Sequence, residues 1–371
     1  GPGATNLGST SGSVTSTSGS DFLLTASTMG HDKFTTVLYG GFDGFDIKEK
    51  SPLNQRVLPS TATEKNSYAY YTVTKAIEII KDPERVECNL LSIPGITNPN
   101  LTTRLVRIAE DRADTMAVID IEDDFTPPGN NTNTDMANQG DVDQAVRTMK
   151  DRKIDSSYGA AYYPWVQIQD TRTNQILWAP PSVVALGTMA YSDAARDVWF
   201  APAGFTRGGL TATGAGGVPV VGVNQQLTSK QRDKLYEVNI NPIASFPAEG
   251  IVIFGQKTLQ LTPSALDRIN VRRLLVFLKK EISRIASTTL FEPNVETTWA
   301  SFRSRADLLL STVKQGLGLA DYKLVLDETT TTPDLIDRNV MYAKVYLKPA
   351  RAIEFIALDF IITRSGASFE D

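Results

Sequence analysis

Few residues of this sequence have side chains that could carry catalysis. The single histidine, His31, stands between Gly30 and Asp32, and one histidine cannot build a multi-histidine zinc site. A Ser/His/Asp triad is formally possible, but no G-x-S-x-G motif accompanies the histidine, so we favour a solvated loop residue. Cys88 is the only cysteine, which excludes an internal disulfide framework, and we expect it to be a small buried core residue. The sequence therefore predicts no catalytic residue.

An acidic group and a glycine-rich stretch are the remaining candidates for a metal or cofactor site. The acidic group comprises Asp120, Glu122, Asp123 and Asp124, whose oxygens could bind a divalent cation. Its spacing does not match a calcium loop, and a solvated strand end is the favoured interpretation. The stretch 204–222 is rich in glycine but lacks the Gly-Lys-Ser/Thr of a phosphate-binding loop. We therefore predict neither a metal nor a cofactor.

Composition limits the classes of protein that remain. The 371 residues exceed what one hydrophobic core usually supports, so we expect two or more packed units. No apolar run approaches about 18 residues, which predicts no membrane insertion. The formal charge of −5 argues against direct nucleic-acid binding, which normally requires a basic excess. Residues 1–20 are almost all small or polar, and with no initiator methionine at Gly1 we interpret them as a linker or a processing scar.

Helical and strand patterns alternate through the first two-thirds of the chain. Apolar spacing and helix breakers predict helices over 71–81, 101–113 and 142–153, and strands over 87–93, 115–121 and 160–168. Such alternation is typical of an α/β layer with parallel strands, and the run 115–121 suits a strand covered on both faces. We therefore predict a mixed α/β fold, with an α/β body over 21–249 and a smaller α+β domain over 250–371.

The C-terminal third opens with a strand over 250–254 and a helix whose start carries Ser264 and Asp267 at capping-box spacing. One face of this helix is apolar and is expected to be core: Val271, Leu274, Leu275, Leu278, Ile282 and Ile285. A second helix carries Trp299, Phe302, Leu309 and Val313 on one side and ends at Gly316. Strands are predicted over 322–327, 340–347 and 353–363.

Basic residues form two rows beside the apolar face of the first of these helices. One row contains Arg268, Arg272 and Lys279, and the other contains Arg273, Lys280 and Arg284. A solvated polar face is the favoured interpretation of any such row. Pairing with acidic residues of the same domain and contact with an acidic partner remain as alternatives.

The last predicted strand has apolar residues on both faces. Ile356, Leu358, Phe360 and Ile362 point one way, and Ile353, Phe355, Ala357 and Ile361 point the other. A terminal strand of this kind is either central in its own sheet or inserted into the sheet of another molecule.

Several motifs, taken in order, resemble those of contractile tail sheath proteins of myovirus-type bacteriophages. The run DRINVRRL at 267–274 is followed by FEPN at 291–294 and by Trp299. Tyr-Pro-Trp at 163–165, Pro-Pro-Ser at 180–182 and Ala-Pro-Ala-Gly at 201–204 add to the likeness, as do the stretches 239–241 and 246–250. The glycine-rich stretch 40–46 fits as well. The resemblance extends over residues 85–363.

This resemblance implies a structural subunit that stacks as hexameric rings around a tail tube and contracts to drive the tube through the host envelope during DNA ejection. It implies other copies, the tube, the baseplate and a tail terminator as partners, in a virion assembled in the host cytoplasm. Terminal arms of this family add strands to neighbouring C-terminal domains, and Ile353, Phe355, Ile356, Leu358, Phe360 and Ile362 match such an arm. Because the C-terminal domain faces the tube in this family, Arg272, Arg273, Lys279 and Lys280 become candidate tube-facing residues. From the residues alone, an α/β hydrolase-like or nucleotide-using enzyme stays open as the alternative.

Overall fold

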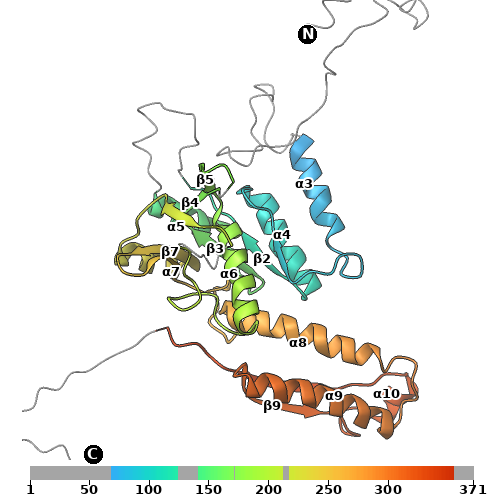
Figure 1. Cartoon of the computed structure of the whole chain (residues 1–371). Coiled ribbons are helices and arrows are strands. Elements are labelled where there is room, and N and C mark those ends of the chain that lie inside the picture. Colours follow the sequence, from blue (N-terminus) through green and yellow to red (C-terminus); the bar gives the residue numbers. More distant parts are fainter. Residues whose placement is uncertain (1–67, 124–140, 171, 212–216, 355–371) are drawn as a thin grey trace, which may run out of the picture. The chain divides into compact units, whose positions relative to one another are not determined.

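The computed structural model describes residues 68–123, 141–170, 172–211 and 217–354, which all fall within one compact unit (Figure 1). His31, the predicted linker 1–20 and Asp124 lie outside these described residues.

A five-stranded sheet forms the centre of the body, with strand order β1-β2-β3-β7-β8. The first four strands are parallel, and β8 pairs antiparallel with β7. The strands are β1 (Leu90–Ser92), β2 (Met116–Ile119), β3 (Gly159–Tyr163), β7 (Ile240–Phe246) and β8 (Gly250–Ile253). Every residue of β2 is buried, as expected for a continuous apolar run in a parallel sheet covered on both faces. The predicted α/β body is confirmed.

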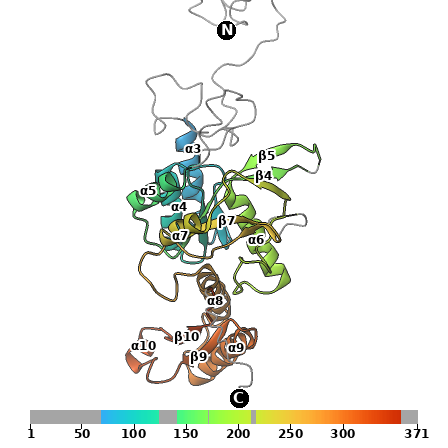
Figure 2. The same ribbon diagram turned by 90° about the vertical axis from the view of Figure 1, so that its left-hand side faces the viewer.

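Helices cover both faces of this sheet (Figures 1 and 2). One face, with Val118 and Tyr162, packs against α6 and the first residue of α8. The other face meets α4 at Gly159, where a Cβ would lie 2.8 Å from Leu259 Cδ1 and 3.1 Å from Val106 Cγ2, so a larger residue would force these side chains to shift. The body helices are α3 (Tyr68–Ile79), α4 (Pro99–Arg112), α5 (Val142–Arg152), α6 (Pro181–Ala195) and α7 (Ser229–Glu237).

Local signals explain where several of these helices begin. Asn98 caps α4 by accepting hydrogen bonds from the backbone N–H groups of Asn100 and Leu101, with Pro99 at the first helical position. A capping box between Thr228 and Gln231 starts α7. Neither α6 nor α7 is among the helices predicted from the sequence.

The predicted single strand over 160–168 is wrong, because the chain forms two strands in two different sheets. β3 ends at Tyr163, and β4 (Val166–Gln169) lies between β5 (Ile176–Ala179) and β6 (Val220–Val223) in a separate antiparallel sheet. Pro164 stands at the break, and proline has no N–H to donate to a strand ladder.

The C-terminal part is the predicted α+β arrangement. It contains α8 (Ile269–Ser287), α9 (Glu296–Gln315), β9 (Leu319–Val325), α10 (Pro333–Asp337) and β10 (Lys344–Pro349). The predicted apolar face of α8 is confirmed, since Leu274 and Leu278 are buried against α9 and β9. The predicted capping box is wrong: α8 begins at Ile269 after Arg268, and the Ser264 hydroxyl instead accepts hydrogen bonds from the Leu266 N–H and the Gln260 side chain.

The domain boundary predicted at residue 250 needs correction. It would separate β7 from β8, yet these two strands pair from Ile243–Ile253 to Phe246–Gly250. Gly250 makes the turn between them possible, because its φ of +76° favours glycine. Residues 250–253 therefore belong to the body sheet.

Candidate functional site

Helix α8 belongs to two hydrophobic cores at once. Its first residue, Ile269, lies in the body core with residues of β2, β3 and α6. One turn further along, Leu274 and Leu278 pack with Leu310 and Val313 of α9. A helix shared between two cores cannot rotate without disrupting both, so α8 joins the body and the C-terminal part rigidly.

Trp199, in the loop after α6, reinforces this joint. Its ring packs against Phe277 of α8 with centroids 5.9 Å apart, and its Nε1 donates a 2.7 Å hydrogen bond to the carbonyl oxygen of Gly316. Gly318 permits the close fit, because a Cβ there would lie 2.7 Å from Val313 Cγ1 and 2.9 Å from the Trp199 ring. A body residue thus holds the turn that follows α9.

Two of the predicted tube-facing residues are buried inside the chain. Arg272 and Arg273 are each 6% exposed. Arg272 hydrogen-bonds to Ser157 and stacks on the Tyr158 ring with its Cζ 3.9 Å from the centroid, while Arg273 pairs with Asp193 at 2.5 Å. The prediction that these two side chains face the tube is therefore wrong, because α8 lies against the body at this point.

Lys279 and Lys280 also contact the body. Lys279 donates to the Arg112 carbonyl oxygen at 3.4 Å, and Lys280 donates to the Cys88 carbonyl oxygen at 2.7 Å and to Asn89. Lys279 remains exposed and Lys280 is half-buried. Cys88 itself is half-buried and not a core residue as predicted, and burial raises the pKa of its thiol.

Within the part of the chain that the structure describes, the C-terminal sheet has no neighbouring strand at either edge. Among the described residues, β9 and β10 pair only with each other, antiparallel, from Lys344–Val325 to Lys348–Asp321. The inward side chains Leu324, Val345 and Leu347 pack on α8 and α9 but are only half-buried. Two strands alone cover a hydrophobic face poorly, and their free N–H and C=O groups can pair with further strands.

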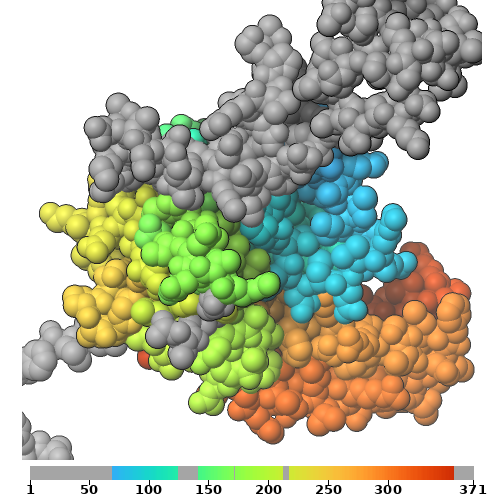
Figure 3. Space-filling model, turned by 45° about the horizontal axis from the view of Figure 1, so that its top comes forward, coloured from blue at the N-terminus to red at the C-terminus, as the bar shows by residue number. Residues whose placement is uncertain are grey.

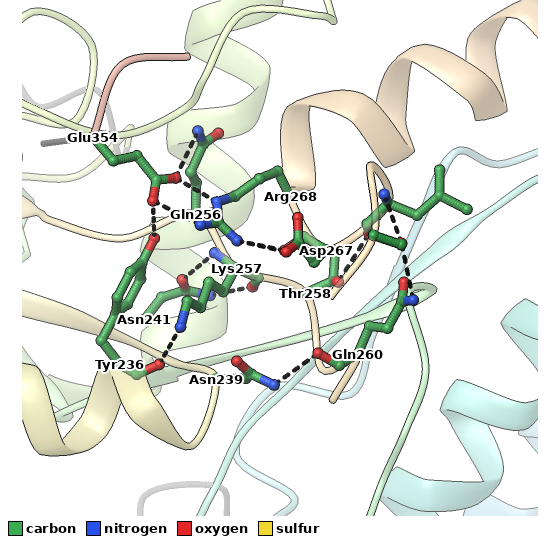
Figure 4. Close-up of polar contacts among 12 residues, drawn as sticks. Tyr236, Asn239, Asn241, Gln256, Lys257, Thr258, Gln260, Asp267, Arg268 and Glu354 are labelled. Atoms are coloured by element: carbon green, nitrogen blue, oxygen red, sulfur yellow. Dashed lines mark hydrogen bonds and ion pairs between the residues drawn. The ribbon is translucent and has the colours of Figure 1, made fainter. Parts of the chain in front are cut away.

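The chain is anchored where it leaves this sheet. Glu354 forms a bidentate ion pair with Arg268, with Nε–Oε1 at 2.6 Å and Nη2–Oε2 at 2.9 Å (Figure 4). The Tyr236 hydroxyl donates to Oε2 at 3.1 Å and Gln256 Nε2 donates to Oε1 at 3.3 Å. We call these four residues the Glu354 anchor. They come from α7, the segment after β8, the start of α8 and the C-terminal segment, so the anchor fixes the C-terminal segment to the body.

A second layer holds the Tyr236 side of the anchor. Lys257 Nζ donates to the Tyr236 carbonyl oxygen at 2.7 Å and lies 4.2 Å from the centroid of its ring. Asn241, on β7, accepts the Lys257 N–H at 2.6 Å and donates to the Lys257 carbonyl oxygen at 2.8 Å (Figure 4). Burial and the neighbouring Glu354 carboxylate raise the pKa of Tyr236, so its hydroxyl stays a donor.

The predicted arm, residues 353–363, begins at this anchor and includes Glu354. Ile353 is 84% exposed and lies in no strand. Phe355, Ile356, Leu358, Phe360 and Ile362 lie outside the described residues.

The interpretation of the acidic group as a solvated strand end holds for Glu122, which is exposed, but is wrong for two of its members. Asp120 is 1% exposed and accepts hydrogen bonds from the N–H of Gly95 and from the N–H and hydroxyl of Ser182. Asp123 is buried as well and accepts from the Trp165 N–H and from Asn224. Both carboxyl groups therefore bind neighbouring segments to the end of β2. Within the described ranges, no group of three or more His, Cys, Asp or Glu residues is placed to hold a metal ion.

No helix among the described residues is long and apolar enough to cross a membrane. The surface of the body also carries an exposed aromatic side chain: Tyr71 of α3, the helix drawn in blue in Figure 3, is 62% exposed.

A family model matches the C-terminal part of the chain. Residues 262–363 match the model of the phage tail sheath C-terminal domain. The match begins after the body sheet and contains the shared helix α8, the open sheet, Arg268 and Glu354. The resemblance to contractile tail sheath proteins is thereby confirmed.

Individual relatives agree with this class. The tail sheath protein of Vibrio phage KVP40 is 38% identical over 221 residues, which are 59% of this chain and 30% of that protein. The tail sheath protein of Enterobacteria phage T4 is 38% identical over 194 residues, or 52% of this chain and 28% of that protein. The chain thus spans about a third of the length of these relatives. Among solved structures, the sheath complex of an extracellular contractile injection system (PVC) in its contracted state is 25% identical, with a TM-score of 0.59 over 79% of this chain and 75% of that one.

Proposed function

We propose that this chain is a structural subunit of a contractile phage tail sheath, which polymerises as stacked hexameric rings around a tail tube. The observation that carries the proposal is the sheath-domain match over 262–363, in which one chain combines an open two-stranded sheet with an anchored C-terminal segment. Relatives named as tail sheath proteins and a contractile-system sheath of similar fold support it.

The arm is the proposed link between subunits. Because Glu354 is held by its own subunit, the part of the predicted arm 353–363 that follows it, residues 355–363, adds as a strand to the β9–β10 sheet of a neighbour. Backbone hydrogen bonds there supply affinity, and alternate side chains set the register. The half-buried Leu324, Val345 and Leu347 would then gain cover. The Glu354 anchor fixes the root of the arm, so that a pull on the arm reaches the body.

No enzymatic step is part of this proposal. Contraction draws on free energy stored in a metastable arrangement of subunits, and small gains at each interface add up over the polymer. The matches give no support to the alternative of an α/β hydrolase-like or nucleotide-using enzyme. The tube, the baseplate and the tail terminator are the proposed partners, in a virion assembled in the host cytoplasm.

Removal of residues 355–371 tests the arm. The truncated chain keeps the Glu354 anchor, so we expect unchanged folding by circular dichroism and thermal melting but no tubes or rings by electron microscopy. Deletion of 365–371 alone is the matched control and should leave assembly intact. Normal tubes from the longer truncation would refute the arm, whereas a loss of folding would assign the strand to the core of its own subunit.

Contact of Lys279 and Lys280 with an acidic surface of the tube is a separate proposal. Because Lys280 also holds the segment before β1, Lys279→Glu is the cleaner substitution. We expect weaker assembly around the tube and stronger salt sensitivity, with thermal stability unchanged. Lys314→Glu on α9, also exposed, provides a control charge reversal. Assembly equal to that of the unsubstituted chain would leave Lys279 as a solvated side chain.

A further inference from the structure

A polar cleft of about 790 Å³ lies between α3 and α4 and reaches Arg152, the last residue of α5. Four cations line it, together with two carboxylates: Lys81, Arg104, Arg107, Arg152, Glu78 and Asp111. Arg104 pairs with Glu78, and Lys81 pairs with Asp111 at 3.5 Å. Across the described residues, no ion pair engages Arg107 or Arg152, so the cleft carries two uncompensated positive charges.

Arg152 is the more unusual of the two. Its Nη2 donates to the hydroxyls of Thr102, at 2.6 Å, and Thr103, at 3.2 Å, and its Nε is buried without a hydrogen-bond partner. Burial lowers the pKa of Arg152 to about 10, which still leaves the guanidinium charged at neutral pH. A desolvated cation without a counter-charge is unfavourable, and a carboxylate from outside would relieve that cost.

The beginning of α4 adds to the positive potential of the cleft. Pro99 and Asn100 occupy its first turn and line the cleft, and the N-terminal end of a helix carries a partial positive charge. Arg107 lies two turns further along α4 and is exposed. The cleft thus presents a fixed guanidinium at its base and an accessible one at its rim.

We propose that this cleft binds a carboxylate-bearing segment of a second copy of this chain. The inference rests on the proposed function, because only a polymer brings copies together at a fixed distance. A second copy fits the charge: the chain has 42 acidic against 37 basic residues and a formal charge of −5, so its surface supplies carboxylates. Paired guanidinium groups suit carboxylates because they donate several hydrogen bonds in one plane.

The first test measures the cleft in isolation, with fluorescein-labelled hexaglutamate as the probe. We expect the full chain to bind the probe at low salt, and Arg107→Glu to weaken binding by at least about tenfold, because it removes one close charge contact and adds a repelling carboxylate. Arg152→Gln should weaken it to a similar degree with the thermal melt unchanged. Arg147→Glu is the matched control, since Arg147 is an exposed arginine of α5 outside the cleft. Equal binding by Arg107→Glu and the control would overturn the proposed site.

The second test asks where the carboxylate comes from. A photo-crosslinking amino acid at position 107, irradiated in assembled polymer, should give crosslinks between copies that map to an acidic segment. Crosslinks confined to one chain, for example to residues 1–67 or 124–140, would overturn the second copy as occupant. A chain that binds hexaglutamate normally but forms no polymer would instead contradict the proposed function and leave the carboxylate site standing.

Discussion

Glu354→Gln tests whether the Glu354 anchor holds the C-terminal segment on the body. The substitution keeps the shape of the side chain but removes its charge, and it turns an amide NH₂ toward the Arg268 donors. The ion pair is partly shielded, with Glu354 17% and Arg268 25% exposed. Hydrogen bonds to charged groups contribute roughly 1.5–3 kcal/mol when shielded, whereas exposed pairs contribute about 0–1 kcal/mol. We therefore expect the anchor to lose about 1.4 kcal/mol, which corresponds to tenfold more frequent local opening.

Hydrogen exchange of the Ala350 amide reports this opening directly. Its N–H donates to the Gly318 carbonyl oxygen at 3.1 Å, so it exchanges only when the segment detaches. Glu354→Gln should accelerate that exchange about tenfold, while Tyr236→Phe, which removes one hydrogen bond, should have a smaller effect. The control is Lys314→Gln, which removes an exposed ion pair with Asp321 in the same domain and should leave the exchange unchanged. If Glu354→Gln leaves the Ala350 rate unchanged while global stability is also preserved, the anchor does not hold the segment.

Two further predictions concern the body and the joint. Burial raises the pKa of Asp120 to about 6, above the value near 4 in an unfolded chain, so the folded state keeps this proton longer. Protonation of Asp120 therefore stabilises the folded state most below about pH 4, and this stabilisation declines by roughly 2–3 kcal/mol as the pH rises through 6. The unfolding free energy of Asp120→Asn, measured with denaturant from pH 4 to 7, should lack this decline. Trp199→Ala should lower the unfolding free energy by about 3 kcal/mol, because it removes the Phe277 contact and the hydrogen bond to Gly316. An unfolding midpoint in urea equal to that of the unsubstituted chain would show that the joint does not depend on Trp199.

The sequence predicted the elements whose signals are local and periodic. The apolar spacing of α8 and the glycine after α9 correctly predicted two long helices. The apolar run at Met116–Ile119 correctly predicted a central strand. The sequence pattern gave wrong predictions where tertiary contacts determine the local structure. The mostly apolar and aromatic stretch 160–168 predicted one strand, although the chain changes sheet at Pro164. The Ser264 hydroxyl accepts hydrogen bonds within the preceding turn and does not cap α8.

The candidate site was harder to predict from the sequence, because its residues contact partners that lie far away along the chain. Arg268 lies 86 positions from Glu354, and Arg272 lies 115 positions from Ser157. The basic rows therefore predicted a solvent-exposed face on α8. Periodicity alone cannot distinguish a face that is exposed to solvent from one that packs against polar groups of another element. One signal was available for the anchor: Glu354 is a single carboxylate inside the apolar stretch 352–358. An isolated charge in such a run usually has a specific partner.

The joint and the anchor together decide how a force on the arm would act. If the arm pairs with a neighbouring sheet, tension enters at Glu354 and passes to Arg268, the residue directly before α8. α8 is packed into both cores, so the body and the C-terminal part must respond as one unit. Because the anchor lies at the start of the shared helix and not on the small β9–β10 sheet, tension on the arm would reach the body without passing through that sheet. A subunit built in this way would keep its fold under such tension, because the contact that resists the pull, the Glu354–Arg268 ion pair, connects directly to the helix that both cores share.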